Sequence, residues 1–264
     1  MKHRMAKLTF SILIILAVLA LSTGSVFVAA TTDNPSKGPP TLDRVIFVHY
    51  PKDVPAKGGN PGKPPPDSGD TTKEWYKYSG IHWNATNIPV TYKVNISGYS
   101  NDFLAGVQAA FQAWEADDQS SIDFEYYGSF TGLPSSFLGG GAANGINEVG
   151  WVDISRQYSN AIAVTMIWYN PLTKEITEVD MAMNSVLPWA QSTISGDPDQ
   201  ASGVSGRYDV QNIATHEVGH WLMLGDLYNK PTMTQTMYGY GSLGEVSKRS
   251  LESGDLAGLR AIYP

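Results

Sequence analysis

Two histidines, His216 and His220, lie four residues apart in a segment rich in apolar residues that runs from Arg207 to Met223. Side chains four apart on a helix project from the same face on successive turns, so the two imidazoles can reach one ion only if this segment is helical. Asp209 stands where it can cap the N-terminus of such a helix. We therefore predict a helix over residues 207–223, and this requirement constrains the fold more than any other feature of the chain.

Glu217 directly follows His216 and gives the histidine pair a chemical role. Zinc held by three protein ligands keeps a fourth position for water and lowers the pKa of that water to about 7. A neighbouring carboxylate that does not bind the ion can take the water's proton as the water attacks a carbonyl. The alternative is a surface helix that carries these residues by chance, but the chain has only five histidines. The sequence therefore indicates His216 and His220 as metal ligands and Glu217 as a general base.

Such a centre needs a third protein ligand. The other histidines lie in the apolar N-terminal region, in a proline-rich segment and at the start of the folded domain: His3, His49 and His82. We expect a packed or surface position for His82, and therefore a carboxylate as the third ligand. Asp226 follows ten residues after His216. Glu245 and Glu252 are the alternatives on later elements.

The composition limits both the chemistry and the partners. The chain has no cysteine, which excludes disulfides, cysteine-bound zinc and thiol catalysis. Its formal net charge is −7. An acidic chain of this kind is not expected to bind the phosphate backbone of nucleic acid.

The N-terminus has the three parts of a secretory signal. Basic residues precede an apolar run, Leu8 to Leu21, and small residues, Val28-Ala29-Ala30, follow it. We predict a signal peptide over residues 1–30 and a secreted, extracellular protein that has no stable membrane association after cleavage. The alternative is an uncleaved N-terminal anchor with the rest of the chain facing outside, because the apolar span is long enough to cross a bilayer.

A proline-rich stretch follows the predicted signal. Residues 35–66 contain nine of the sixteen prolines of the chain, and four glycines. This composition is typical of a linker. We interpret residues 31–72 as a pro-segment or linker and residues 73–264 as the catalytic domain. One apolar patch inside the stretch, Val45–Val48, is a candidate docking strand.

Hydrophobic periodicity within the domain predicts both strands and helices. Alternating apolar residues, or apolar runs bounded by a turn signal, predict four strands at 90–94, 122–126, 161–168 and 176–183. Helical spacing predicts two helices besides 207–223, at about 102–116 and at 251–262. Strands and helices do not alternate regularly, so the fold class expected is α+β.

Several motifs, in this order, resemble those of the matrixin-type metzincins. The matching segments are YKYSGIHW (76–83), DMAMN with Trp189 (180–189), THEVGHWLMLGD (215–226), TMY (236–238) and LESGDLAGLRAIY (251–263). The third is similar to the family's long zinc motif, and the fourth looks like its Met-turn. The resemblance covers roughly residues 75–264 and is specific, because unrelated motifs occur in the expected order.

The resemblance implies a zincin or metzincin-like α+β fold, with a twisted mixed sheet, an active-site helix and a C-terminal helix. It implies that the metal is zinc, that Asp226 is the third ligand, as in the snapalysin branch, and that Met237 lies beneath the metal. It also implies that Asp255 ties the closing helix to the Met-turn. A peptide substrate is then expected to pair with an edge strand at 161–168. A structural calcium ion is compatible with the family, with Asp180 as a weak candidate ligand.

The sequence departs from the family's pattern at two turns. Met223 stands where the family usually has the glycine at which the chain leaves the helix. Either Met223 adopts a positive φ, at a cost of about 1–2 kcal/mol, or Gly225 takes over the turn. Gly239 follows the Met-turn where the family has proline.

The function expected from these residues is that of a secreted zinc-dependent endopeptidase acting on protein or peptide substrates. The alternative is a catalytically silent, secreted binding protein of zincin fold, against which the intact Glu217 argues. A further hypothesis is that Asp67 or Asp70 binds the zinc and keeps the enzyme latent, although a plain spacer is the preferred interpretation of residues 31–72.

Overall fold

The computed structural model describes residues 41–52, 75–139, 141–193 and 202–264. All of these belong to one compact unit, Pro40–Pro264. The predicted signal peptide lies outside the described residues, as do Asp67 and Asp70. No helix in the described part of the chain is long and apolar enough to span a membrane.

The described residues form strands and helices in mixed order. The strands are β1 (Asp43–Pro51), β2 (Val90–Asn95), β3 (Phe124–Ser129), β4 (Glu148–Val152), β5 (Ala163–Tyr169), β6 (Ile176–Asn184), β7 (Trp189–Ala190), β8 (Tyr208–Asp209) and β9 (Tyr240–Gly241). The α-helices are α1 (Asn101–Glu115), α2 (Val210–Trp221) and α3 (Ser253–Ile262).

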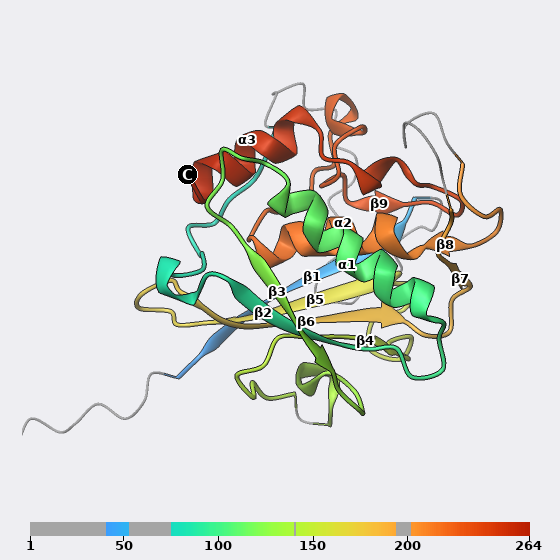
Figure 1. Ribbon diagram of the computed structural model, residues 1–264, viewed down its shortest axis with the longest axis horizontal. Coiled ribbons are helices and arrows are strands. Elements are labelled where there is room, and N and C mark those ends of the chain that lie inside the picture. Colours follow the sequence, from blue (N-terminus) through green and yellow to red (C-terminus); the bar gives the residue numbers. More distant parts are fainter. Residues whose placement is uncertain (1–40, 53–74, 140, 194–201) are drawn as a thin grey trace, which may run out of the picture. The chain divides into compact units, whose positions relative to one another are not determined.

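Seven strands form one sheet in the order β3-β2-β4-β6-β5-β1-β9 (Figure 1). Strands β3, β2, β4 and β6 run parallel to one another, and β5 is antiparallel to β6. β1 is antiparallel to β5, and β9 is parallel to β1. β7 and β8 make a separate parallel pair. A mixed sheet with three helices, one of them C-terminal, confirms the α+β prediction.

Helices α1 and α2 pack against each other over one face of the sheet (Figure 1). The packing is closest at Gly219 of α2, where a Cβ would clash with the side chains of Met237 and Trp114. Trp114 Nε1–H also donates to the carbonyl of Thr215 (2.8 Å), which fixes α1 to α2. Every residue of α2 from Asn212 to Trp221 is buried, so this helix lies in the core.

The predicted elements are present with shifted ends. The helices predicted at 102–116, 207–223 and 251–262 are α1, α2 and α3, and the four predicted strands are β2, β3, β5 and β6. Asp209 caps α2 as predicted, because its side chain accepts a hydrogen bond from the Asn212 N–H (3.0 Å). The helix begins only at Val210 because Tyr208 and Asp209 are used in β8.

β1 lies in the stretch that the composition alone assigns to a pro-segment or linker. It contains the apolar patch Val45–Val48, and no proline falls between residues 41 and 50. It pairs with β5 over seven positions, from Asp43↔Tyr169 to His49↔Ala163. β5, which we expected at the edge of the sheet, is therefore paired on both sides.

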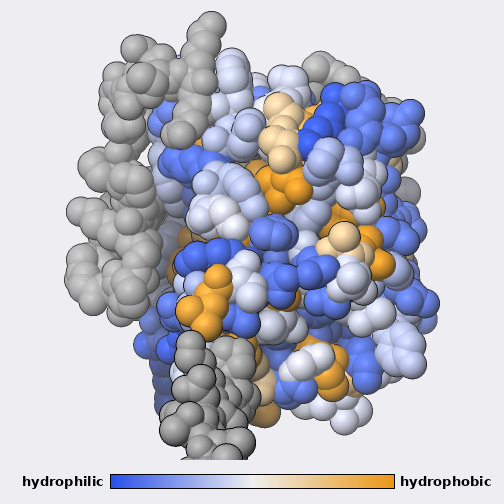
Figure 2. Space-filling view, turned by 90° about the vertical axis from the view of Figure 1, so that its left-hand side faces the viewer, coloured by the Kyte–Doolittle hydropathy of each residue, from blue (hydrophilic) through white to orange (hydrophobic). Residues whose placement is uncertain are grey.

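The face shown in Figure 2 carries small hydrophobic groups separated by hydrophilic residues. Scattered apolar side chains are normal on a protein surface and do not by themselves mark a binding site. The side chains that could bind a metal or transfer a proton are instead buried in and around α2.

Candidate metal centre

Helix α2 places His216 and His220 on one face, as their spacing predicts. Both side chains are fully buried, and their ring centroids are 4.7 Å apart at an interplanar angle of 87°. His216 Nδ1 lies 2.8 Å from the carbonyl oxygen of Thr236, and His220 Nδ1 lies 2.7 Å from that of Leu224. A carbonyl oxygen can only accept, so each Nδ1 carries the ring proton. Each Nε2 is then left with a free lone pair, which is the form of histidine that binds a metal.

The chain leaves α2 through a left-handed turn at Met223. Its φ is 62°, and Leu224 N–H returns to the carbonyl of Gly219 (3.0 Å). Of the two possibilities for this turn, Met223 therefore adopts the positive φ, and Gly225 does not. The turn brings Asp226 back under the helix, where Oδ1 lies 3.2 Å from His216 Nε2 and 3.5 Å from His220 Nε2.

These three side chains fit a tetrahedral ion. The facing atoms, two Nε2 and Asp226 Oδ1, are buried and lack a hydrogen-bond partner of good geometry, and the three lie within 4.8 Å of one another. Two ligands at zinc distances of about 2.0–2.1 Å, set at a tetrahedral angle, stand roughly 3.3 Å apart. The observed separations of 3.2 and 3.5 Å match that spacing. The donor set, two imidazoles and one carboxylate, can therefore hold a metal ion. The carboxylate of Asp226 raises the pKa of His220 above its usual value, so a metal ion would compete with a proton for this imidazole.

Burial and hydrogen bonding set the charges in this site. Burial lowers the pKa of His216 to about 4, so its imidazole is neutral at pH 7. Burial raises the pKa of Glu217 to about 7. Thr165 on β5 donates to Glu217 Oε2 (2.5 Å), whereas Oε1 has no partner of good hydrogen-bond geometry. Glu217 is thus a carboxylate that can exchange a proton near neutral pH.

Sequence reasoning missed His49, which lies against the site from β1. Its ring is 3.9 Å from that of His216, and its Nδ1 is 3.3 Å from Glu217 Oε1. Two positions earlier, Phe47 stacks on His220 at 4.0 Å and 2°. The alternation of β1 places Val45, Phe47 and His49 on one face, but nothing in the spacing of these residues links them to a motif more than 160 residues later. The apolar patch was the only local signal.

Met237 and Asp255 support the floor of the site. Asp255, at the start of α3, accepts hydrogen bonds from the N–H groups of Thr236 (2.8 Å) and Met237 (3.1 Å). Met237 is buried, and its sulfur packs against Gly219. Gly219 lies between His216 and His220 in the sequence of α2. The carbonyl of Thr236 orients His216, so this turn and the metal ligands form one hydrogen-bonded unit.

The rival ligands lie elsewhere. Glu245 Oε2 accepts from the Ser242 N–H (2.9 Å), and Glu252 forms a capping box at the N-terminus of α3. His82 is half-buried, with Nδ1 at 3.4 Å from the Tyr78 hydroxyl. None of these three belongs to a potential metal-binding group among the described residues.

Asp180, the weak calcium candidate, is engaged with backbone donors. Its carboxylate accepts from the N–H groups of Ser136 (2.8 Å) and Glu148 (3.0 Å). Ser135 Oγ adds a third hydrogen bond (3.2 Å). Glu178 Oε1 shares the Ser135 hydroxyl with Asp180 (3.1 Å), so a second carboxylate lies near it. Asp180 belongs to neither of the two groups of described residues that could hold a metal ion, His216-His220-Asp226 and His49-His216-Glu217. A calcium ion at Asp180 stays a prediction, and the contacts seen here tie a loop to the sheet.

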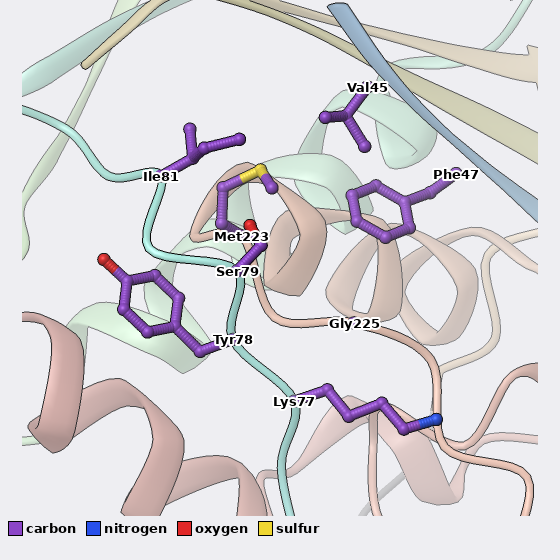
Figure 3. A pocket seen from close by; sticks show the side chains of 8 residues that line it. All are labelled: Val45, Phe47, Lys77, Tyr78, Ser79, Ile81, Met223 and Gly225. Atoms are coloured by element: carbon purple, nitrogen blue, oxygen red, sulfur yellow. The ribbon is translucent and has the colours of Figure 1, made fainter. Parts of the chain in front are cut away.

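An apolar pocket lies beside the candidate metal centre. It has a volume of ≈ 350 Å³ and is lined by the eight residues labelled in Figure 3, which are Val45, Phe47, Lys77, Tyr78, Ser79, Ile81, Met223 and Gly225. Phe47 contributes to the wall of the pocket and also stacks on His220, so this side chain of β1 contacts both the pocket and a candidate ligand.

Comparison of the chain with known protein families and with curated proteins finds no match.

Proposed function

We propose that this protein is a secreted zinc-dependent endopeptidase of metzincin type. One observation carries the proposal: three buried ligand atoms without a hydrogen-bond partner of good geometry converge, Asp226 Oδ1 lies from each histidine Nε2 at the spacing of a tetrahedral site, and Glu217 is next to His216 in the chain. This constellation suits the hydrolysis of a carbonyl compound by a metal-activated water. The motifs THEVGHWLMLGD and TMY, in that order, favour a peptide bond as the substrate.

Zinc is the metal that the ligand chemistry favours. Two imidazole nitrogens and one carboxylate oxygen, with one position left open, are typical of catalytic zinc. Each imidazole is oriented by a backbone carbonyl, as is usual for zinc-bound histidines. When bound, zinc would polarise the scissile carbonyl and lower the pKa of a water at the open position to about 7.

Glu217 is the group that moves the proton in this proposal. Its Oε1 is free of internal hydrogen bonds of good geometry and can accept the proton of the attacking water, while Thr165 holds Oε2 in place. A base with a pKa near the working pH can accept the proton and then return it. Glu217 would deliver it to the nitrogen of the leaving amine as the peptide bond breaks.

The substrate would bind as an extended strand. β5 carries Thr165, the partner of Glu217, so a peptide that paired with β5 in place of β1 would have its carbonyls beside the base. The apolar pocket next to His220 favours substrates with an apolar side chain at the corresponding position. Export rests on the predicted signal peptide, and the membrane-anchored form is the alternative.

The test of turnover is Glu217→Gln. The variant should keep its zinc, because the Glu217 side chain is not one of the three ligands. It should lose roughly 10²–10⁴-fold in the rate of casein cleavage, since the base is gone. Glu245→Gln, which changes a glutamate outside the site, is the matched control and should leave the rate unchanged. Cleavage by Glu217→Gln at the wild-type rate would refute this role.

A further inference from the structure

Lys248 is a buried cation close to the candidate metal centre. It is 2% exposed, and its ammonium group donates hydrogen bonds to the carbonyls of Tyr238 (2.5 Å) and Tyr240 (2.8 Å), in the segment that follows Met237. Lysine is almost never fully buried unless it is paired with an anion. Within the part of the chain that the structure describes, however, no carboxylate forms an ion pair with Lys248. The charge of this ammonium group is therefore left without a direct counter-charge.

The third acceptor of the ammonium group is a side chain of β1. His49 Nε2 lies 3.4 Å from Lys248 Nζ. An ammonium group has three hydrogens and no lone pair, so His49 Nε2 is the acceptor and Nδ1 carries the ring proton. Nδ1 lies on the other side of the ring, 3.3 Å from Glu217 Oε1. Lys248 thus has three acceptors for its three hydrogens, and only one of them belongs to a side chain.

The ring of His49 fills a narrow space between α2 and β9, which we call the Lys248 subsite. The ring lies 3.9 Å from that of His216. A Cβ on Gly241 would lie only 2.9–3.1 Å from the side chains of His49, Ile162 and Ile213, so glycine leaves the room that the ring needs. The subsite is lined by Ile162, Ile213, His216, Gly241 and Lys248. Its walls are largely apolar, and a cation stands at its end.

A substrate residue in the place of His49 would meet the same groups. The carboxylate oxygens of glutamate lie as many bonds from Cα as Nε2 of histidine does, whereas those of aspartate lie one bond closer. A glutamate carboxylate in the subsite would therefore reach Lys248, and it would point away from Glu217, which faces the Nδ1 side. Burial lowers the pKa of Lys248, so a buried anion beside it would stabilise the charged ammonium group. A side chain without an acceptor would leave one N–H of Lys248 buried and unpaired, which is unfavourable.

We propose that Lys248 determines the specificity of this site, and that the protein selects substrates with a glutamate in the position that His49 occupies. This inference rests on the proposed function, because it names the substrate class of the same site. Alternate residues of an extended peptide face the same way, so the residue two positions earlier would lie in the place of Phe47, beside the apolar pocket. The substrate is then an extended segment with an apolar residue followed, two positions later, by glutamate. A site that hydrogen-bonds a substrate group discriminates strongly against analogues that lack this group.

The first experiment changes residue 49 in the full chain and needs no substrate. His49→Glu, His49→Gln and His49→Met put a charged acceptor, a neutral acceptor and no acceptor into the Lys248 subsite. At one denaturant concentration, the unfolding equilibrium constant should rise in that order, at least tenfold from His49→Glu to His49→Met. In the Lys248→Met background the order of these two variants should reverse, because the cation is gone. A purely structural role of Lys248 would destabilise all three variants without reversing their order.

The second experiment maps the bonds that are cut in casein. Mass spectrometry of the fragments from the unchanged, zinc-loaded chain should show glutamate enriched at least tenfold over methionine at one fixed position relative to the cleaved bond, after correction for the composition of casein. In Lys248→Met this enrichment should disappear, and apolar residues should replace glutamate at the same position. Lys230→Met, which changes an exposed lysine outside the site, is the matched control and should leave the preference unchanged.

The outcomes separate the two proposals. Cleavage of casein with the same preference in Lys248→Met as in the unchanged chain would overturn the role of Lys248 and keep the peptidase. The expected order of the residue 49 variants without any casein cleavage would keep the anion-selective subsite and overturn the peptidase. If Lys248→Met does not fold, because two carbonyls lose their donor, the residue 49 series in the unchanged background decides. Stability of His49→Met equal to or above that of His49→Glu would then overturn the inference.

Discussion

Among single residues, the atoms that are buried without a hydrogen-bond partner mark the candidate metal centre. In the described residues, the buried atoms without a good hydrogen bond include Nε2 of His216, Nε2 of His220 and Oδ1 of Asp226. Unpartnered buried polar groups are costly, at about 1–3 kcal/mol each. A metal ion bound among these atoms would satisfy all three at once.

Replacing the carboxylate ligand should move the pH dependence. Two neutral imidazoles and one carboxylate give zinc a net charge of +1, whereas Asp226→His would give +2. The bound water should then be more acidic, so the pH profile of the rate should move to lower pH in Asp226→His. The rate–pH profile of casein cleavage, compared between the variant and the unchanged chain, checks this. A shift to higher pH would contradict the ligand assignment.

Thr165 should act as a positioning residue for Glu217. Its hydrogen bond stabilises the charged form of the carboxylate and so opposes the rise of its pKa. In Thr165→Val the pKa of Glu217 should therefore rise further, and the acidic limb of the kcat/KM profile should move to higher pH. At neutral pH, kcat/KM should fall by a factor that corresponds to about 1.5–3 kcal/mol, the contribution of a hydrogen bond to a charged group. An unchanged profile would show that Thr165 does not tune the base.

At the scale of elements, the sequence predicted α2 because its periodicity and its cap are local signals. Asp209 caps the helix, and the histidines face one way because of their spacing. The candidate strand at Val45–Val48 is confirmed as part of β1, but its partner could not be predicted, since the pairing with β5 joins residues more than 110 positions apart. The proline-rich surroundings outweighed a short apolar patch, and His49 was assigned to a linker for that reason. Asp226 was one of three candidates until the turn at Met223 was known.

The close packing of α2 can be tested by comparing alanine substitutions at two glycines, one in α2 and one in α1. Gly219→Ala should destabilise the protein by about 1–3 kcal/mol, because its Cβ would clash with the Met237 sulfur and with Trp114 in the core. Gly106→Ala in α1 mainly meets the end of Gln191, which can rotate away, and alanine favours a helix over glycine. Denaturant unfolding should therefore show a larger loss for Gly219→Ala. Equal losses would contradict this account of the packing.

The loop that Asp180 holds should respond to pH. Burial raises the pKa of Asp180 to about 7, against about 3.9 for an unfolded aspartate. The folded state therefore binds the proton more tightly than the unfolded state does. The contribution of Asp180 to the free energy of unfolding is at its largest below about pH 4 and is lost as the pH rises through 7. The free energy of unfolding of the unchanged chain should fall relative to that of Asp180→Asn over this range, by at most about 1.4 kcal/mol per pH unit. Glu125→Gln, at an exposed position, serves as the control. If the difference in free energy of unfolding between the unchanged chain and Asp180→Asn did not change with pH, or changed in the opposite direction, the raised pKa of Asp180 would be refuted.

In the whole molecule, two parts of the chain have different predicted roles. Residues 1–30 are predicted to direct export, and the unit built around α2 is predicted to bind the metal. If export proceeds as predicted, N-terminal sequencing of protein from the medium should find a start near Thr31. Recovery of an intact Met1 form from membranes would favour the anchored alternative.

The metal content of the chain shows whether His216, His220 and Asp226 hold a zinc ion. Elemental analysis of the purified protein should find one zinc per chain, and Asp226→Ala should lose it because the third ligand is gone. Glu245→Ala and Glu252→Ala should keep it, since their carboxylates lie outside the metal-binding groups of the described residues. Full zinc in Asp226→Ala, together with zinc loss in either glutamate variant, would contradict the account.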